Sequence, residues 1–153
     1  MIYKYLSFSI AITFISFMVG MVVNVLWKNT PFYNNKLSNL NFIESKILNK
    51  YFGVDIVKWI IKNTPFKYFN QKLRLRNKIE KTDLHELRKE MTSSEIDHLL
   101  GFVFVAIFAL MKFYKNEWLF GLTIMIVNIL MNLHPSLLQQ QNKRRIDTLI
   151  KKR

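Results

Sequence analysis

Three long apolar stretches dominate the pattern of hydrophobic and polar positions along this chain. Residues 5–27 and 118–142 contain no Asp, Glu, Lys or Arg, and the apolar stretch at 96–111 contains only Asp97 and His98 as ionisable residues. The first and last stretches are long enough for a helix to cross about 30 Å of hydrocarbon. The pattern predicts an all-α membrane protein with three transmembrane helices, one N-terminal anchor and one C-terminal hairpin.

The expected boundaries place the 153 residues in a single membrane domain. We expect transmembrane helices at about 5–27, 95–114 and 117–135, a basic region with amphipathic interfacial helices at 28–94, and a basic tail at 136–153. The short polar segment at 112–117 predicts an antiparallel hairpin of the second and third helices. No small-residue cleavage site follows the first helix, which predicts a retained anchor rather than a signal peptide. Asn24, near its end, is expected to be an interfacial side chain.

Helix-start signals occur in the region between the first two apolar stretches. The segment Lys-Asn-Thr-Pro-Phe occurs at 28–32 and again at 62–66, and in each copy Thr followed by Pro suits an N-cap and first helical residue. Coincidence is the alternative explanation of the repeat. Farther along, Thr82 is expected to cap one helix, and Ser93 or Ser94 to cap the separate helix that enters the membrane.

Apolar residues at helical spacing between residues 43 and 61 predict two short amphipathic helices, with Trp59 beside the second apolar stripe. Flanking lysines suit helices that lie in the cytoplasmic leaflet. The alternative is that these helices cover one another and the hairpin.

The net charge is +13, and the positions of the basic residues along the chain are more informative than the total. Basic residues lie between and after the apolar stretches, so we interpret the charge as an orientation signal and not as a nucleic-acid surface. It predicts a multi-pass protein of the cell membrane with the N-terminus outside, and with the 28–94 loop and the C-terminus in the cytoplasm. A basic run that includes Lys72, Arg74 and Arg76 suits a lipid phosphate or an anionic acyl donor, or forms a solvated face near anionic lipid.

Candidate chemistry gathers where the second apolar stretch begins. Glu95 and His98 are three residues apart and share a helical face. An imidazole is the natural general base near neutral pH, and a carboxylate can fix its tautomer. Because the third helix returns across the membrane, its end should meet the same rim; the polar residues there are Asn132, His134, Gln139 and Asn142. Hydrogen bonding between helices is the alternative role of such residues.

Other chemistries lack their motifs. The chain has no cysteine, which excludes disulfides and thiolate metal ligands. A second Glu-x-x-His motif is absent, so no metal site is expected. No phosphate loop or dinucleotide fingerprint is present, and no cofactor is expected.

Short motifs then connect the chain to a known family. They are Tyr51-Phe52, Lys58-Trp59, Pro65-Phe66, Glu95-x-x-His98, Asn132-x-x-Pro135 and Gln139-x-x-Asn142-x-x-Arg145. Over about residues 28–145 the chain resembles the glycosyl-4,4'-diaponeurosporenoate acyltransferase family of small bacterial integral-membrane proteins. The resemblance implies transfer of a fatty acyl group to a sugar hydroxyl of a carotenoid glycosyl ester, the last step of staphyloxanthin-type synthesis. Val57, Ile60 and Gln140-Gln141 depart from the pattern.

Together these features favour a membrane acyltransferase whose partners are membrane lipids, an acyl thioester donor and a lipidic glycoside acceptor. His98 would remove the hydroxyl proton, Glu95 would orient His98, and Asn132 or Asn142 would steady the developing oxyanion. The expected substrate-binding residues are Arg145, Gln139, His134, Lys72, Arg74, Arg76 and Trp59. The alternative is a non-catalytic membrane protein that binds anionic lipid or a partner through its amphipathic basic loop.

Overall fold

The computed structural model describes residues 1–42, 59, 63 and 81–152. The elements are α1 (Ile2–Trp27), α2 (Pro31–Asn35), the 3₁₀ turn η1 (Leu37–Asn39), α5 (Lys81–Tyr114), α6 (Trp118–Asn128), the π-helical turn η4 (Ile129–Leu133) and α7 (His134–Lys152). Among these described residues, three helical stretches are long and apolar enough to cross a membrane: Ile2–Trp27, Asp83–Tyr114 and Trp118–Lys152. This result confirms the predicted all-α fold class.

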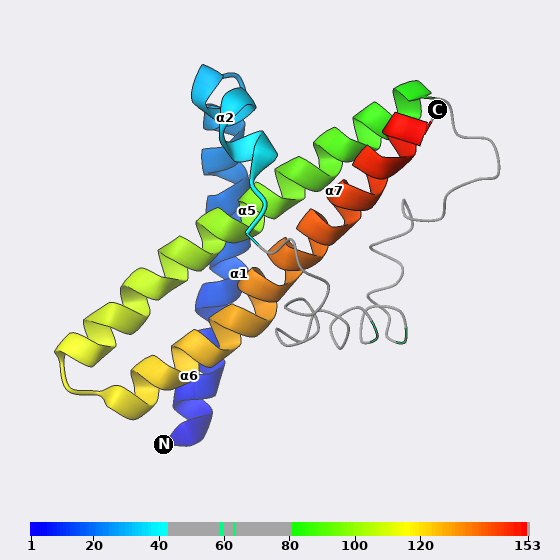
Figure 1. The fold of residues 1–153 in the computed structure, drawn as a ribbon. Helices are drawn as coiled ribbons and strands as arrows, with labels where there is room; N and C mark the ends of the chain where they lie inside the picture. Colours follow the sequence, from blue (N-terminus) through cyan, green and yellow to red (C-terminus); the bar gives the residue numbers. More distant parts are fainter. Residues whose placement is uncertain (43–58, 60–62, 64–80, 153) are drawn as a thin grey trace.

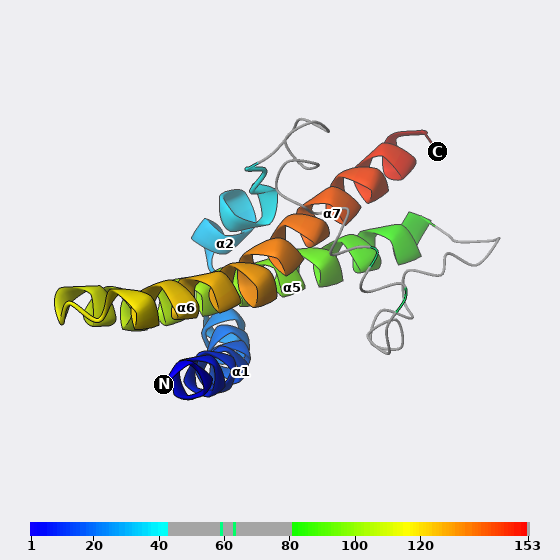
Figure 2. The same ribbon diagram turned by 90° about the horizontal axis from the view of Figure 1, so that it is seen from below.

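The helices form an antiparallel hairpin crossed by a third helix. α5 runs beside α6 and α7 along its length, and α1 crosses the hairpin obliquely on one face (Figure 1). The view from below shows α1 almost end-on beneath the hairpin (Figure 2). α2 and η1 follow the C-terminal end of α1 and return toward the hairpin. The N-terminus and the hairpin turn therefore lie at one end of the molecule. The beginning of α5 and the C-terminal end of α7 lie at the other end.

At the hairpin turn, α5 ends at Tyr114 and α6 begins at Trp118. Lys112 Nζ lies 3.0 Å from Glu117 Oε2 and 4.4 Å from the centroid of the Phe120 ring. Asn116 adopts a positive φ of 59°, a left-handed conformation that Asn tolerates better than most residues. The structure thus has the antiparallel hairpin that the polar segment predicted.

α5 is one continuous helix, so the prediction that Ser93 or Ser94 caps a separate helix was wrong. The hydroxyl and amide groups of this polar segment bind within and between helices instead. Thr92 Oγ1 donates to the Arg88 carbonyl at 2.9 Å, a bond that Ser and Thr make within a helix. Asn24 Nδ2 donates to the carbonyl and hydroxyl oxygens of Ser93 at 3.1 and 2.9 Å. Ser93 therefore binds α1 from the interior of α5 and does not cap the start of a helix.

The third helix continues to Lys152 but contains one π-helical turn. Pro135 has no N–H to donate, and just before it the His134 N–H bonds to the Ile129 carbonyl, five residues back. In a regular α-helix, residues at a spacing of four drift by about 40° per step. A π turn holds more residues than an α turn and offsets this drift. The fully or nearly fully buried row Asn128, Asn132, Ser136 and Gln140 keeps the four-residue spacing through this turn.

α1 approaches α5 closely through small residues. A Cβ atom added at Gly20 would lie 2.2 Å from the Asp97 carbonyl oxygen, so only glycine fits at this crossing. The hydroxyls of Ser9 and Thr13 are fully buried and donate to carbonyls one turn back in α1. Such small residues let membrane helices pack backbone to backbone. The opposite face of α1 exposes large apolar side chains, among them Phe14, Met18 and Val22, which suits contact with lipid.

The loop after α1 is held by a cap and by α7. Thr30 Oγ1 accepts from the Tyr33 N–H at 3.2 Å, and Pro31 is the first residue of α2, which confirms the first predicted helix start. Phe42 N–H donates to Gln140 Oε1 at 3.0 Å. The second predicted start, the amphipathic helices and the basic run fall outside the described residues, except that Trp59 is helical and exposed.

Candidate active site

Buried polar side chains form three clusters where the helices meet. The first joins α5 to α7: Glu95 Oε2 accepts from Lys143 Nζ at 2.6 Å, and Glu95 Oε1 accepts from Gln140 Nε2 at 2.8 Å. The Glu95 side chain is 0% exposed and the Lys143 side chain 4%. Lys143 Nζ also donates to the carbonyls of Ser38 and Leu40 at 3.2 and 3.1 Å. This ion pair therefore fastens α5, α7 and the loop after α2 together.

The second cluster joins α1, α2 and α5. Asn24 Nδ2 donates to Asp97 Oδ1 at 2.6 Å in addition to its bonds with Ser93. Asn24 is 2% exposed, so its amide is buried between helices, a contact that the sequence did not predict. The reason is that α1 crosses α5 at the level of Asn24, where the carboxylate and the Ser93 oxygens need a donor.

The phenol of Tyr33 is buried beside this second cluster. Burial raises the pKa of Tyr33 above its ordinary value of 10.0, and the negative charge of Asp97 raises it further. The ring therefore stays neutral at physiological pH.

The third cluster lies around His98. The Phe17 ring packs edge-on against the His98 imidazole at 5.4 Å between centroids, and the Asn132 side chain lies next to the imidazole on the side of α6 and η4. Asn132 Nδ2 donates to Ser16 Oγ at 3.1 Å and to Asn128 Oδ1 at 2.9 Å. Asn128 Nδ2 donates to the Phe102 carbonyl at 3.0 Å. The Nδ1 atom of His98 and the Oδ1 atom of Asn132 are buried and have no hydrogen-bond partner.

Glu95 and His98 leave the same helix but join different clusters. Glu95 is bound by α7, whereas His98 packs against α1 and Asn132. Within the described part of the chain no hydrogen bond joins Glu95 to His98. The structure therefore supplies Asn132, rather than Glu95, as the polar neighbour of His98.

The other predicted site residues lie on α7, at the separately described Trp59, or outside the described residues. His134 Nδ1 and Gln139 Oε1 are buried without a hydrogen-bond partner. Asn142 is 6% exposed, and Arg145 is exposed. Trp59 is exposed, unlike the buried residues of the three clusters. Lys72, Arg74 and Arg76 lie outside the described residues.

Sequence reasoning missed several residues of the clusters. Lys143 was counted only in the basic tail, and Gln140 only as a departure from the family pattern, yet both bind Glu95. Their spacing of three, on the row that contains Ser136, was the signal that they share a helical face. Ser16 gave no signal, because it is one of several small hydroxyl residues in an apolar helix, with Ser7, Ser9 and Thr13.

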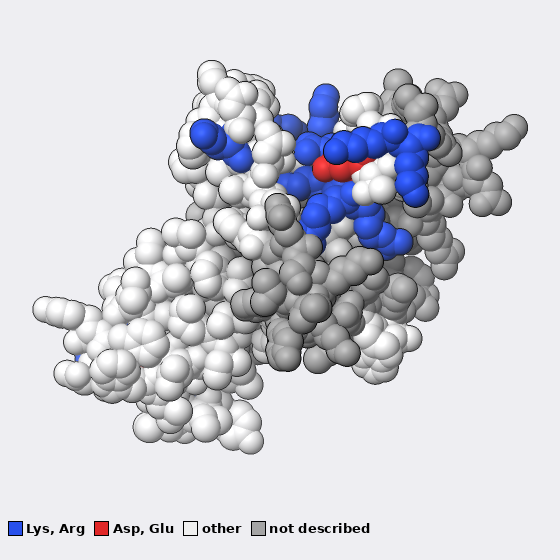
Figure 3. All heavy atoms as spheres, in the orientation of Figure 1, with Lys and Arg blue, Asp and Glu red and all other residues white. Residues whose placement is uncertain are grey.

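The basic residues gather over one end of the molecule. Figure 3 shows a blue surface of Lys and Arg around a small red area where α5, α7 and the loop after α2 lie, and in this view few charged side chains are visible at the opposite end. At the basic end, Arg88 Nε and Nη2 donate to Asp147 Oδ1 and Oδ2 at 2.5 and 3.5 Å.

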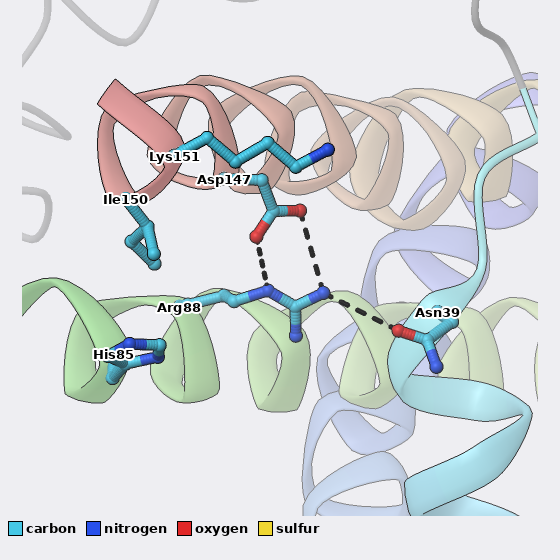
Figure 4. A pocket seen from close by; sticks show the side chains of 6 residues that line it. All are labelled: Asn39, His85, Arg88, Asp147, Ile150 and Lys151. Atoms are coloured by element: carbon cyan, nitrogen blue, oxygen red, sulfur yellow. Dashed lines mark hydrogen bonds and ion pairs between the residues drawn. The ribbon is translucent and has the colours of Figure 1, made fainter. Parts of the chain in front are cut away.

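An open pocket of about 510 Å³ lies at this basic end. Its lining residues are Asn39, His85, Arg88, Asp147, Ile150 and Lys151, and the close view shows Arg88 between Asp147 and Asn39 (Figure 4). Among residues 1–42, 59, 63 and 81–152, no three His, Cys, Asp or Glu side chains gather in a way that could hold a metal ion.

Three spanning-length helices and polar clusters buried between them define the class of this molecule as a helical membrane protein. The family model of glycosyl-4,4'-diaponeurosporenoate acyltransferase matches residues 29–152, which include α5, α6 and α7, and the chain belongs to that family. This match confirms the family that the short motifs suggested. A search of curated proteins and a search of solved structures each found no match to the chain.

Proposed function

We propose that this protein transfers a fatty acyl group to a hydroxyl of a lipidic or glycosylated carotenoid-like acceptor within the membrane. The observation that carries the proposal is the family match over residues 29–152. That stretch contains His98 and its neighbour Asn132, and both lie at the junction of the three long helices. The acyl donor in this proposal is an anionic acyl thioester.

His98 is the general base of the proposed reaction. It is partly buried, and its buried Nδ1 atom has no hydrogen-bond partner. The acceptor oxygen forms a bond with the acyl carbonyl carbon while its proton passes to His98. The bond between that carbon and the thioester sulfur then breaks, and the leaving thiolate takes the proton back from His98. Atoms and charge balance without any further reactant.

The remaining roles follow from where the other side chains lie. Asn132 donates both amide hydrogens within the protein, so Asn142, which is also buried, is the better candidate for steadying the oxyanion. Glu95 acts through the packing of α7 and the loop rather than through His98. Arg145 and the Lys72, Arg74 and Arg76 run would attract the anionic donor, with Gln139, His134 and Trp59 along its path.

The proposed orientation puts the basic end in the cytoplasm. The support is the gathering of Lys and Arg over the beginning of α5 and the C-terminal end of α7 (Figure 3). Cytoplasmic segments of membrane proteins carry such an excess of positive charge. His98 then lies nearer the cytoplasmic face than the hairpin turn does. The N-terminus lies outside.

Comparative lipid analysis tests this proposal. Cells that make glycosylated carotenoids should accumulate acylated glycosides when they express the protein, whereas cells with an empty vector should retain the unacylated glycosides. Mass spectrometry of lipid extracts measures both species. Identical extracts from the two strains, with the protein present in the membrane, would contradict the proposal.

A second candidate function is binding of anionic lipid without catalysis. The basic end of the molecule favours it (Figure 3), since each Lys or Arg near an anionic surface contributes about 1 kcal/mol. Under this function, replacing Trp59 and the apolar residues around it should weaken lipid association, and replacing His98 should have no effect. Lipids retained by the purified protein can be compared by native mass spectrometry.

A further inference from the structure

The hydrogen bonds around His98 have a fixed direction, and this direction assigns roles to two further residues. The Phe102 carbonyl is an acceptor only, so the Asn128 side chain must turn its NH₂ group toward it, as observed at 3.0 Å. The Oδ1 atom of Asn128 then faces Asn132 and accepts from it at 2.9 Å. The orientation of each amide follows from the one before it, beginning at a backbone atom that cannot be reversed.

Ser16 fixes the second amide hydrogen of Asn132. The Ser16 hydroxyl donates to the Thr13 carbonyl at 2.7 Å, so its oxygen is left to accept from Asn132 Nδ2 at 3.1 Å. Both hydrogens of the Asn132 amide are thus committed to protein acceptors. The group that Asn132 presents beyond these bonds is its Oδ1 atom, an acceptor that is buried and has no partner.

Gly101 leaves the space for this arrangement. A Cβ atom at Gly101 would lie 3.0 Å from Asn132 Oδ1 and 3.1 Å from Ser16 Oγ, so a side chain there would press on both groups. Ser16, Asn128 and Asn132 are each fully buried, which excludes water as an easy substitute partner. The His98 imidazole lies beside Asn132.

We propose that Asn128 and Ser16 are positioning residues that aim the Asn132 carbonyl oxygen at the His98 imidazole. An amide oxygen accepts only from a nitrogen that carries hydrogen, so the imidazole nitrogen that faces Asn132 holds the proton. The other nitrogen is then free to act as the base. In this arrangement Asn132 has the orienting role that a carboxylate has in many catalytic sites.

This proposal places α1 in the machinery of the site, although α1 lies outside the stretch that matches the family model. Ser16 acts through Asn132, and Phe17 packs on the other side of the His98 ring. α1 is therefore more than an anchor. The catalytic consequence rests on the proposed acyltransferase function, but the tautomer of His98 does not.

The first experiment is ¹⁵N NMR of histidine-labelled full-length protein in lipid nanodiscs, with the His98 signals assigned by their loss in His98→Gln. Wild-type protein should show one neutral tautomer of His98. Asn132→Leu should show a mixture of tautomers, and Ser16→Ala should shift the signals. Ser9→Ala is the matched control, because Ser9 is equally buried in α1 and donates to its own helix at Tyr5 as Ser16 does at Thr13, whereas Asn132 donates to Ser16 alone of the two. Unchanged His98 signals in Asn132→Leu would overturn the proposal.

The second experiment measures acyl transfer per molecule of membrane protein. Asn132→Leu should reduce turnover by about 100-fold or more, the usual contribution of a positioned general base. Ser16→Ala and Asn128→Ala should each reduce kcat by about three- to tenfold, as expected for one lost hydrogen bond, with KM unchanged. Adding Ser16→Ala to Asn132→Leu should cause no further loss.

Asn132→Asp distinguishes two possible roles of Asn132, a hydrogen-bond acceptor from His98 and a donor to the oxyanion, because a carboxylate can accept but cannot donate. It keeps an oxygen toward His98 but loses the two N–H bonds to Ser16 and Asn128, so its turnover should lie between those of wild type and Asn132→Leu. Activity as low as that of Asn132→Leu would overturn the assigned role. If wild-type protein transfers no acyl group, the proposed function fails while the tautomer experiment still decides the orientation of His98.

Discussion

The buried ion pair between Glu95 and Lys143 provides the sharpest stability prediction. Lys143→Met removes the charge that neutralises a 0% exposed carboxylate and the donor that holds the carbonyls of Ser38 and Leu40. The Glu95 carboxylate would then retain only its bond from Gln140 at 2.8 Å. Breaking a buried pair in this way costs about 3–5 kcal/mol.

The cost can also be estimated from the proton that Glu95 would have to take up in the variant. For a carboxyl group with the ordinary pKa of about 4.3, taking up a proton costs about 3.7 kcal/mol at pH 7 and about 1 kcal/mol at pH 5. The folded variant then holds one more proton than its unfolded chain, so its stability falls as the pH rises. A loss of about 3.7 kcal/mol corresponds to a Tm lowered by about 7–15 °C for a chain of this size.

Thermal unfolding of purified protein in detergent, followed by size-exclusion chromatography, measures this shift. Lys112→Met is the matched control, because the Lys112–Glu117 pair spans a similar 3.0 Å but its side chains are 26% and 40% exposed. Exposed pairs contribute less than about 1 kcal/mol. Glu95→Gln combined with Lys143→Met should recover most of the lost Tm at pH 7. A Tm for Lys143→Met within about 3 °C of wild type, or an equal loss at pH 5 and pH 7, would refute the reasoning.

Three further predictions concern the backbone. Gly20→Ala should lower the Tm by several degrees and reduce the yield of cysteine crosslinks between α1 and α5, because its Cβ would collide with the Asp97 carbonyl. An unchanged crosslinking yield would contradict the close crossing. Pro135→Ala should let the π turn relax and rotate α7 relative to α6, which cysteine crosslinking from α7 to α5 can detect as a change in the favoured pairs. Thr30→Ala should cost about 0.5–2 kcal/mol through loss of the N-cap bond to Tyr33, whereas Thr30→Ser should cost little.

The architecture was predictable because lipid permits few solutions. A chain that crosses hydrocarbon must satisfy its backbone bonds within a helix, so apolar length located α1, the second half of α5 and the start of α6. The polar segment located the turn between Lys112 and Glu117. The start of α2 was predictable from the local chemistry of Thr30 and Pro31. The break expected at Ser93 did not occur, because Asn24 supplies a tertiary donor that a local pattern cannot reveal.

The sequence predicted several residues of the candidate site, but it did not predict which of them contact one another. Helical spacing correctly put Glu95 and His98 on one helix, but it could not show which neighbour each side chain would meet. The π turn changes the direction in which Gln140 and Lys143 point relative to Asn132, and a sequence read at a period of 3.6 residues misses this change. Asn132 was expected to steady an oxyanion, whereas its donors are bound to Ser16 of α1 and to Asn128, partners that its own helical spacing could not reveal in full.

Measurement of acylated product from wild-type and His98→Gln protein, at equal amounts in the membrane, tests the central claim most directly. If His98 is the base of a membrane acyltransferase, lipid extracts from the wild-type strain should contain acylated glycosides and extracts from the His98→Gln strain should contain about 100-fold less or none. Ser9→Ala should match wild type. Equal amounts of acylated product from wild type and His98→Gln would contradict the account.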